Sequence, residues 1–279
     1  MVLDPRPATA PASAERVVSA ERAKIRVVDA TKVYETKSAP VHALEGFSVD
    51  IRDGELVCIL GPSGCGKTTL LWAMSGLHAL TRGEVLLDDK PISGPRPREI
   101  GMIFQDANLL PWRNLRQNIE FPFEIKHEAK DEERIAGLVE ITGLAGFEGA
   151  MPRELSGGMQ QRASIVRALA QDPAVLLMDE PFGALDAFTR DEMNLLLLKL
   201  WSENQKTVVF VTHNIGEAIF LADRVVVMTS RPGRLARIFD IDLPRPRTIE
   251  MTFEPPFISL IQKIKQTVEA GGLRTLEVE

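Results

Sequence analysis

The chain has 279 residues, of which 44% are hydrophobic and 26% are charged, as expected for a globular protein whose core is large enough to fold unaided. Its formal net charge of −6 supplies no basic field that would draw the chain onto nucleic acid. No run approaches the roughly 18 apolar residues that a membrane-spanning helix needs, so we expect no such helix.

Residues 1–22 are rich in proline and alanine and lack the basic stretch and apolar run of a secretory signal. We therefore expect a loose tail before the folded part of the chain and a cytoplasmic location. The two cysteines, Cys58 and Cys65, provide neither a disulfide framework nor a metal cluster, so both are expected to be free thiols.

From Ala23 onward, short β-branched runs alternate with segments of helical periodicity, which is typical of a sheet covered by helices. The pattern predicts strands at 24–30, 43–51, 55–60, 83–87, 100–104, 175–178, 207–211 and 225–228. The near-continuous apolar runs CIL, VLLM, VVFV and VVVM indicate central, buried, parallel strands.

The region from about 106 to 155 contains fewer strand signals and more helix formers, with EAKDEERIAGLVEITGL as its clearest helix. We interpret it as a helical subdomain inserted between two halves of the sheet. The proline-rich segment LPRPR, residues 243–247, then precedes a predicted amphipathic helix at 255–270. Its apolar stripe, which we expect to pack on the core, consists of Phe257, Leu260, Ile261, Ile264 and Val268.

A phosphate-binding loop is predicted between the strand at 55–60 and the helix that follows it. Gly61, Pro62, Ser63, Gly64, Cys65, Gly66, Lys67 and Thr68 read GPSGCGKT and match the pattern G-x-x-x-x-G-K-[ST]. The glycines allow successive backbone N–H groups to curl around phosphates, and the helix start adds its positive dipole end. Lys67 and Thr68 would reach phosphate oxygens and Mg²⁺. A simple glycine turn is the alternative, which the strand and helix flanks disfavour.

Two adjacent carboxylates, Asp179 and Glu180, follow the apolar strand VLLM. The strand would deliver Asp179 to a metal shell, and Glu180 could deprotonate a water for in-line attack on a γ-phosphate. Taken alone, the same segment could be an acidic turn after a core strand.

The segment LSGGMQQR, residues 155–162, resembles the signature motif of ABC ATPases, and GALD, residues 183–186, resembles their D-loop. Ser156 can cap the following helix, while Gly157 and Gly158 expose backbone N–H groups as a second anion-binding surface. The segment departs from the commonest form of the motif at Met159, where many members have glutamine.

Three single residues also resemble positions of this family: Gln105 the Q-loop glutamine, His213 the switch histidine, and Tyr34 the aromatic residue that stacks on adenine. Each has an ordinary alternative when taken alone. These are a polar residue at a strand end, a surface histidine at a helix start, and an aromatic ring of the core.

The resemblance implies an α/β fold, a P-loop NTPase of the ABC ATPase type with a RecA-like core, an antiparallel β subdomain and an inserted helical subdomain at about 106–165. Residues 23–245 would form the nucleotide-binding domain, and residues 246–279 a C-terminal extension. ATP and Mg²⁺ are the implied ligands. Catalysis would depend on Glu180, His213 and Gln105, and the metal would be held by Thr68, Gln105 and Asp179. The nucleotide would be bound by Tyr34, residues 61–68, Thr69, Ser156, Gly157, Gly158 and Asp186.

The family picture also implies partners. Two copies would form an antiparallel homodimer with two ATPs between them, peripheral to the cytoplasmic face of the inner membrane. An integral membrane permease would bind the dimer, and an extracytoplasmic substrate-binding protein would act indirectly. Leu110, Trp112 and Phe121 could line the docking groove for the permease, or could be buried within the helical subdomain.

The segments NLLPWRNLRQNI and MTSRPGRLARIFDIDLPRPR look like the branch of bacterial importers for nitrate, sulfonates and taurine. A transporter for another substrate or direction, such as an exporter or an importer of amino acids or lipids, stays open. A non-transport ABC ATPase acting on DNA or ribosomes is a further alternative, although the coiled-coil insertions, cysteine-rich modules and second ATPase domain typical of those proteins are missing from this sequence.

Overall fold

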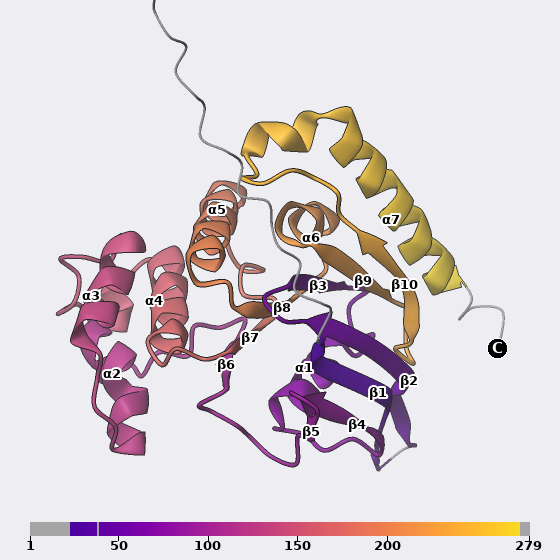
Figure 1. Ribbon diagram of the computed structural model, residues 1–279, viewed down its shortest axis with the longest axis horizontal. Coiled ribbons are helices and arrows are strands. Elements are labelled where there is room, and N and C mark those ends of the chain that lie inside the picture. The colour runs from indigo at the N-terminus through magenta and orange to yellow at the C-terminus, as the bar shows by residue number, and fades with distance from the viewer. Residues whose placement is uncertain (1–22, 38, 274–279) are drawn as a thin grey trace, which may run out of the picture.

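The computed structural model describes residues 23–37 and 39–273, which form two β-sheets with helices around them (Figure 1). The first sheet is antiparallel, with the order β2-β1-β4-β5: β1 (Ala23–Tyr34), β2 (Val41–Arg52), β4 (Arg82–Leu87) and β5 (Lys90–Pro91). The second has the order β10-β9-β3-β8-β7-β6: β3 (Leu56–Leu60), β6 (Ile100–Ile103), β7 (Val175–Asp179), β8 (Thr207–Thr212), β9 (Arg224–Met228) and β10 (Leu235–Asp240). Its strands are parallel except β10, which pairs with β9 in the antiparallel sense. The predicted parallel core and antiparallel β subdomain are therefore confirmed.

Strand β3 shows how one sequence serves two apolar cores. Leu56, Cys58 and Leu60 belong to a cluster formed with the helices on one face of the second sheet. Val57 and Ile59 belong to another cluster, which includes helix α1 (Lys67–Ser75) and the first sheet. Because successive side chains of a strand alternate between its faces, an apolar run of this kind requires cover on both sides.

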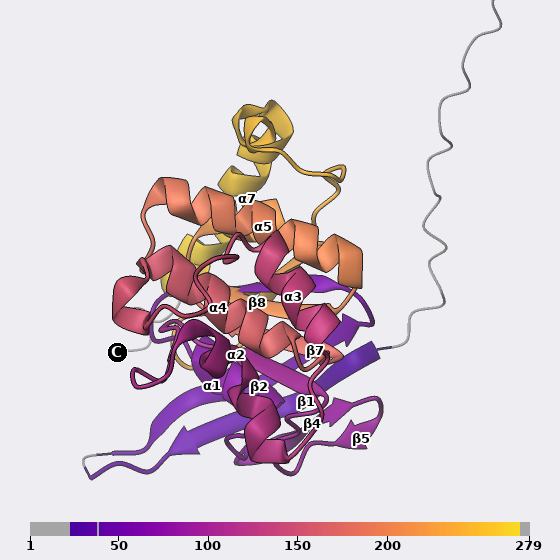
Figure 2. The same ribbon diagram turned by 90° about the vertical axis from the view of Figure 1, so that its left-hand side faces the viewer.

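The inserted helical subdomain follows β6 and lies to one side of the sheets (Figure 1). It contains α2 (Leu115–Lys126), α3 (Glu132–Ile141), the 3₁₀ turn η1 (Pro152–Glu154) and α4 (Gly157–Leu169). Asn114, Asp131 and Ser156 cap the three α-helices, each through a side-chain oxygen that accepts a backbone N–H. The chain then returns to the sheet as β7. Figure 2 shows α2, α3 and α4 turned toward the viewer.

All eight predicted strands are present, with ends that differ by at most four residues from the observed ends. Two strands were not predicted. Strand β5 has only two residues, and β10 has the sequence LARIFD, in which charged and apolar residues do not alternate cleanly. Both lie at sheet edges, where little burial is imposed on the sequence.

The remaining helices cover the second sheet: α5 (Ala187–Asn204), α6 (Ile215–Leu221) and, after the 3₁₀ turn η2 (Ile249–Phe253), α7 (Pro255–Leu273). The expected packing of the C-terminal helix is confirmed. Phe257 and Ile264 are buried, and Leu260, Ile261 and Val268 pack against the same cluster from partly buried positions. Helix α7 contacts α6, β9 and β10.

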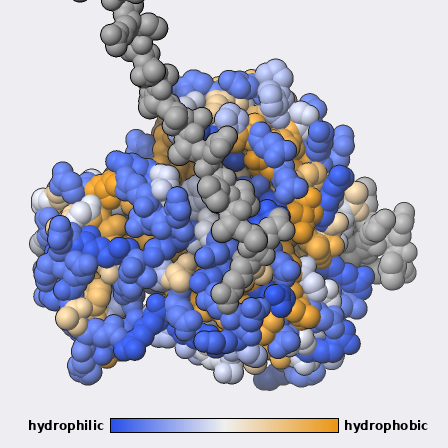
Figure 3. Space-filling view, in the orientation of Figure 1, coloured by the Kyte–Doolittle hydropathy of each residue, from blue (hydrophilic) through white to orange (hydrophobic). Residues whose placement is uncertain are grey.

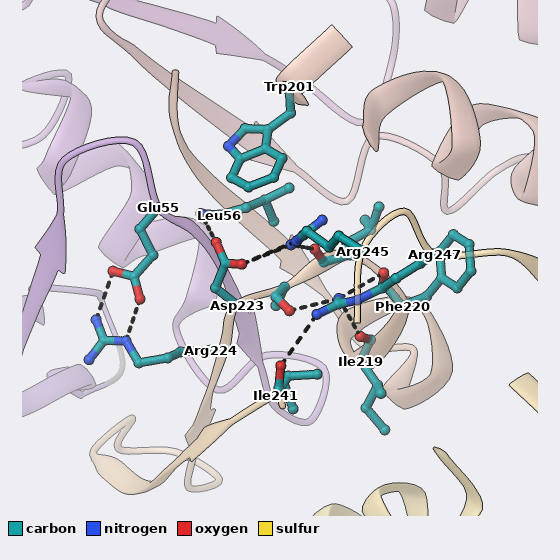
Figure 4. A network of polar contacts seen from close by, with 12 residues as sticks. Glu55, Leu56, Trp201, Ile219, Phe220, Asp223, Arg224, Ile241, Arg245 and Arg247 are labelled. Atoms are coloured by element: carbon teal, nitrogen blue, oxygen red, sulfur yellow. Dashed lines mark hydrogen bonds and ion pairs between the residues drawn. The ribbon is translucent and has the colours of Figure 1, made fainter. Parts of the chain in front are cut away.

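The segment that leads to α7 is fixed to the core by a polar network (Figure 4). Arg247 is buried and donates to the carbonyl oxygens of Ile219, Phe220 and Ala222 at 2.8–2.9 Å. Desolvation, together with the nearby charge of Arg245, lowers the pKa of Arg247 to about 10. Arg245 pairs with Asp223 at 3.0 Å, and its guanidinium lies 4.3 Å from the ring centroid of Trp201.

The face seen in Figure 3 is mainly hydrophilic, with hydrophobic patches between hydrophilic residues. Among the described residues, no helix has the length and apolar character required to cross a membrane. Cys58 and Cys65 are both buried and unpaired, as expected.

Candidate active site

The loop between β3 and α1 closes around the side chain of Lys67. Gly66 precedes the helix with φ 106°, and a Cβ atom there would lie 2.5 Å from the carbonyl oxygen of Ala43, so only glycine fits. The Lys67 Nζ is buried and donates to the carbonyl oxygens of Gly61 at 2.9 Å and Pro62 at 3.1 Å. A cation is thus held at the centre of a loop whose next residues begin a helix, which is an arrangement suited to phosphate.

The neighbouring residue of the loop, Thr68, contacts the end of β7. Its Oγ1 donates to Oδ1 of Asp179 at 3.1 Å. Asp179 is only 8% exposed, and desolvation raises the pKa of its carboxyl, against the opposing effects of the Thr68 hydrogen bond and the Lys67 charge. A hydroxyl and a carboxylate brought together in this way are hard oxygen donors, which fit Mg²⁺.

Glu180 links Lys67 to His213. Its Oε1 lies 3.4 Å from Lys67 Nζ, and its Oε2 lies 2.7 Å from Nδ1 of His213, which follows β8. The backbone of Glu180 has φ 44°, an uncommon value for a non-glycine residue, and its N–H donates to the carbonyl oxygen of Val211 at 3.0 Å. The carboxylate is therefore held beside the loop while one side remains accessible.

Gln105 and Tyr34 lie near different parts of this centre. Gln105 is exposed after β6, and a Cβ atom on Gly183 would lie 3.7 Å from its Nε2. The Tyr34 hydroxyl lies 3.5 Å from Oγ1 of Thr69 and 3.3 Å from Nδ1 of His78. Tyr34 thus stands beside the start of α1. The ring centroid of His78 lies 4.6 Å from that of Trp72.

The segment Ser156–Gly158 lies next to the start of α5. Ser156 Oγ accepts from the N–H of Met159 at 3.2 Å, and a Cβ atom on Gly158 would lie 2.8 Å from Cγ2 of Thr189. Asp186 caps α5 by accepting from Thr189 N at 3.1 Å, and this side-chain and backbone hydrogen bonding lowers the pKa of Asp186. Ser156 and Gly157 are exposed. Within the described residues, no hydrogen bond or ion pair joins this segment to the phosphate loop.

Comparison with known proteins decides the family. The sequence profile of the ABC transporter family matches residues 44–183, half of the chain. The chain belongs to the ABC transporter family. It is an ATP-binding subunit that hydrolyses ATP.

The similarity to other ABC proteins extends over nearly the whole described chain. It is 48% identical over 228 residues to an uncharacterized ABC transporter ATP-binding protein of Methanocaldococcus jannaschii, covering 81% of this chain and 85% of that protein. It is 42% identical over 244 residues to the aliphatic sulfonates import ATP-binding protein of Bacillus cereus, covering 87% and 95%.

Two solved structures share the fold. A dimeric ATP-binding cassette bound to ADP and phosphate matches with a TM-score of 0.70 and 33% identity, covering 79% of this chain and 100% of that one. A Clostridium perfringens protein that is part of an ABC transporter complex matches with a TM-score of 0.71 and 27% identity, covering 88% and 100%.

Two residues of this ABC ATPase were not recognised from the sequence as parts of the centre. Arg190 donates to the carbonyl oxygens of Phe182 at 3.3 Å and Leu185 at 2.8 Å, and so fixes the segment after Glu180. Glu217 is buried behind His213 and accepts from Thr212 Oγ1 at 2.5 Å, and desolvation raises its pKa. The sequence signal for Glu217 is its position three residues after Asn214, and this spacing indicates a helix cap rather than a part of the centre.

Proposed function

We propose that this ABC ATPase energises the import of a small sulfonate or a related anion through a separate permease. Support for the substrate class comes from the similarity to the Bacillus cereus sulfonate importer subunit, which covers 95% of that protein. The observation that carries the catalytic part is the position of the Glu180 carboxylate, 3.4 Å from Lys67 and 2.7 Å from His213.

In the proposed reaction, Lys67 and the backbone N–H groups of the phosphate loop bind the β- and γ-phosphates. Glu180 accepts a proton from water as the water oxygen attacks the γ-phosphorus and the bond to the ADP oxygen breaks, which yields ADP and phosphate. His213 holds the Glu180 carboxylate in place and faces the γ-phosphate. Tyr34 provides a ring beside the adenine.

Thr68, Asp179 and Gln105 are the residues that would hold Mg²⁺. When bound, the metal neutralises the negative charge of the phosphates. The Thr68–Asp179 pair supports this assignment because two oxygen ligands already lie 3.1 Å apart next to Lys67.

We further propose that two copies assemble head to tail, so that Ser156, Gly157 and Gly158 of one copy complete the phosphate site of the other, with Asp186 close to the partner's phosphate loop. The exposed position of Ser156 and Gly157, without a bond to their own phosphate loop, supports this arrangement, as does the dimeric cassette of the similar structure. The permease would dock on the helical subdomain near Trp112, which is 70% exposed. Leu110 and Phe121 are only partly exposed.

The catalytic assignment is tested by comparing Glu180→Gln with the wild type and with Glu203→Gln, an exposed glutamate on α5. We expect Glu180→Gln to reduce turnover by at least a hundredfold and to accumulate as an ATP-dependent dimer by light scattering, while Glu203→Gln behaves like the wild type. Normal turnover by Glu180→Gln would refute the role of this residue.

The substrate proposal needs a separate experiment. The chain would be reconstituted in liposomes with the permease and binding protein from the same genome, and ATPase stimulation would be measured with aliphatic sulfonates, taurine, nitrate and an amino acid. Stimulation by sulfonates or taurine supports the proposal. Stimulation by the amino acid alone contradicts it.

A further inference from the structure

A groove separates the last turns of α7 from the turn between β9 and β10, on a part of the molecule that the catalytic proposal does not use. Its volume is about 760 Å³. Residues 229–232 and 234–237 form one wall, and Lys263, Gln266, Thr267 and Ala270 are among the residues of the other. This volume lies within the range of small-molecule sites, roughly 300–1,000 Å³, and is far larger than a single oxyanion requires.

The lining of this α7 groove is positively charged although the whole chain carries a net charge of −6. Arg231, Arg234, Arg237 and Lys263 line it, and no aspartate or glutamate does. Arg234 pairs with Glu45 at 2.8 Å. In the part of the chain that the structure describes, Arg231, Arg237 and Lys263 form no ion pair. Three cations therefore line one open space without an ion-pair partner among the described residues.

Apolar groups lie between these cations. Pro232, Leu235 and Ala236 belong to the same wall, and Leu235 is 37% exposed. The Arg237 guanidinium lies 4.9 Å from the ring centroid of Phe239, which orients it along the strand. A ligand that matches this surface has an organic body, which contacts the apolar residues, and two or more anionic groups, which pair with the cations of the two walls.

The same groove is connected to the phosphate loop. Arg231 Nε donates to the carbonyl oxygen of Gly64 at 3.1 Å, and a Cβ atom on Gly233 would lie 2.2 Å from the carbonyl oxygen of Cys65. At the other end, Ser230 Oγ donates to the carbonyl oxygen of Gly271 in α7 at 3.2 Å. A guanidinium has five N–H donors, so Arg231 can hold Gly64 through Nε and an anion in the groove through its terminal nitrogens.

We propose that the α7 groove binds a small organic molecule with two or more phosphate or carboxylate groups, and that Arg231 couples its occupancy to the phosphate loop. Binding fixes the Arg231 side chain on Gly64 and so orders the loop before ATP arrives, which lowers the KM for ATP. The binding part stands without the proposed function, whereas the effect on KM rests on the ATP site described above.

The test is a binding titration of the full chain by calorimetry, with fructose 1,6-bisphosphate and inositol hexakisphosphate as probes. Binding at the phosphate loop is identified by repeating each titration with Lys67→Ala, which should weaken binding there and leave binding at the groove unchanged. The groove variant is Arg237→Glu with Lys263→Glu. The matched control is Lys199→Glu with Lys265→Glu, which changes the net charge equally at exposed positions outside the groove.

We expect at least one probe to bind the wild type and the control with equal, submillimolar affinity. Its affinity for the groove variant should be at least about tenfold lower. The proposal is overturned if neither probe binds, or if the control loses as much affinity as the groove variant. The melting temperature of each double variant is measured to check that it is folded.

Two other occupants are outcomes of the same experiment. If a probe binds only after residues 274–279 are deleted, the groove is the site of the chain's own terminal segment and the proposal fails. If the groove variant abolishes sedimentation with phosphatidylglycerol vesicles while free probes never bind, the ligand is a lipid headgroup and the small-molecule proposal fails.

The coupling is tested with Arg231→Gln. The bound probe should lower the KM for ATP at least twofold in the wild type, and this shift should disappear in Arg231→Gln although the probe still binds through Arg237 and Lys263. An unchanged shift overturns the role of Arg231. If the wild type hydrolyses no ATP when no probe is present, the proposed function fails, and the groove is then tested by the binding titration alone.

Discussion

At the scale of single residues, the candidate active site contains residues whose burial or backbone conformation is energetically unfavourable. Asp179 is a carboxylate in a nearly closed site, and Glu180 has a positive φ. The sequence was sufficient to predict that both residues lie beside a phosphate loop, because they follow an apolar strand and the loop pattern is present in the same chain. Arg190 and Glu217 could not be identified, since their roles depend on which carbonyl and hydroxyl groups the fold brings to them.

Asp179→Asn should stabilise the nucleotide-free protein while reducing its activity. Desolvation is the main cause that raises the pKa of Asp179 in the folded state. The ionised carboxylate therefore lowers the stability of the fold, and this stability is regained as the pH falls through the folded-state pKa. A neutral isostere removes this cost at pH 7. We expect a higher melting temperature without Mg²⁺ and nucleotide, and ATPase activity reduced by at least about tenfold.

The matched control is Asp191→Asn, an exposed residue on α5, which should change neither property. A lower melting temperature for Asp179→Asn would show that its bond to Thr68 outweighs the desolvation.

Gly66→Ala should destabilise the fold by about 1–3 kcal/mol and abolish ATP binding. Its φ of 106° and the 2.5 Å approach of a Cβ atom to the Ala43 carbonyl leave no room for a side chain. Urea unfolding provides the measurement. Gly149→Ala serves as control because a Cβ atom there meets nothing within 4 Å. Equal stability of the two variants would contradict the steric argument.

At the scale of elements, the sequence predicted what burial imposes. The central strands are apolar throughout because they are covered on both faces, and Ser156 caps its helix as expected. Asp186 and Asn214 also form cap hydrogen bonds. Strand β5 escaped prediction because it has only two residues, and β10 because LARIFD has neither a continuous apolar run nor a clean alternation. The element pattern left open whether Trp112 is buried in the helical subdomain or lies in a docking groove, because this depends on tertiary packing.

Helix α4 offers a way to separate capping from phosphate contact. Ser156→Ala removes the bond to Met159 N and should lower the stability by about 1 kcal/mol. Ser156→Asp keeps a capping oxygen but adds a negative charge where the proposed dimer places a γ-phosphate. It should unfold in urea like the wild type and still lose ATPase activity. Full activity of Ser156→Asp would contradict a contact of this residue with phosphate.

At the scale of the whole molecule, α7 and the segment before it are integrated with the ATPase core. Phe257 and Ile264 enter the same apolar cluster as β3 and α6, and Arg247 fixes the end of α6 through three carbonyl oxygens. The boundary near residue 245 stays a prediction from the sequence. The apolar stripe of the helix was predictable, but its partner surface, formed by elements distant in the chain, was not.

Ile264→Ala should cost about 2–5 kcal/mol of unfolding free energy, because it removes a fully buried side chain from that cluster. Ile258→Ala, on the same helix, is the control, as Ile258 is 43% exposed and should cost less than about 1 kcal/mol. Both are measured by urea denaturation monitored by circular dichroism. Similar losses for the two variants would mean that α7 is not packed as described.

The separation of Ser156–Gly158 from the phosphate loop of the same chain has a genetic consequence. If each hydrolytic centre combines the loop of one copy with the signature segment of the other, a defect in Lys67 and a defect in Ser156 are complementing alleles. Each variant on its own should lack ATPase activity. A mixed dimer of the two, however, contains one centre in which both halves are intact. Co-expression should therefore restore a measurable part of the activity, whereas two alleles that both alter Lys67 should restore none.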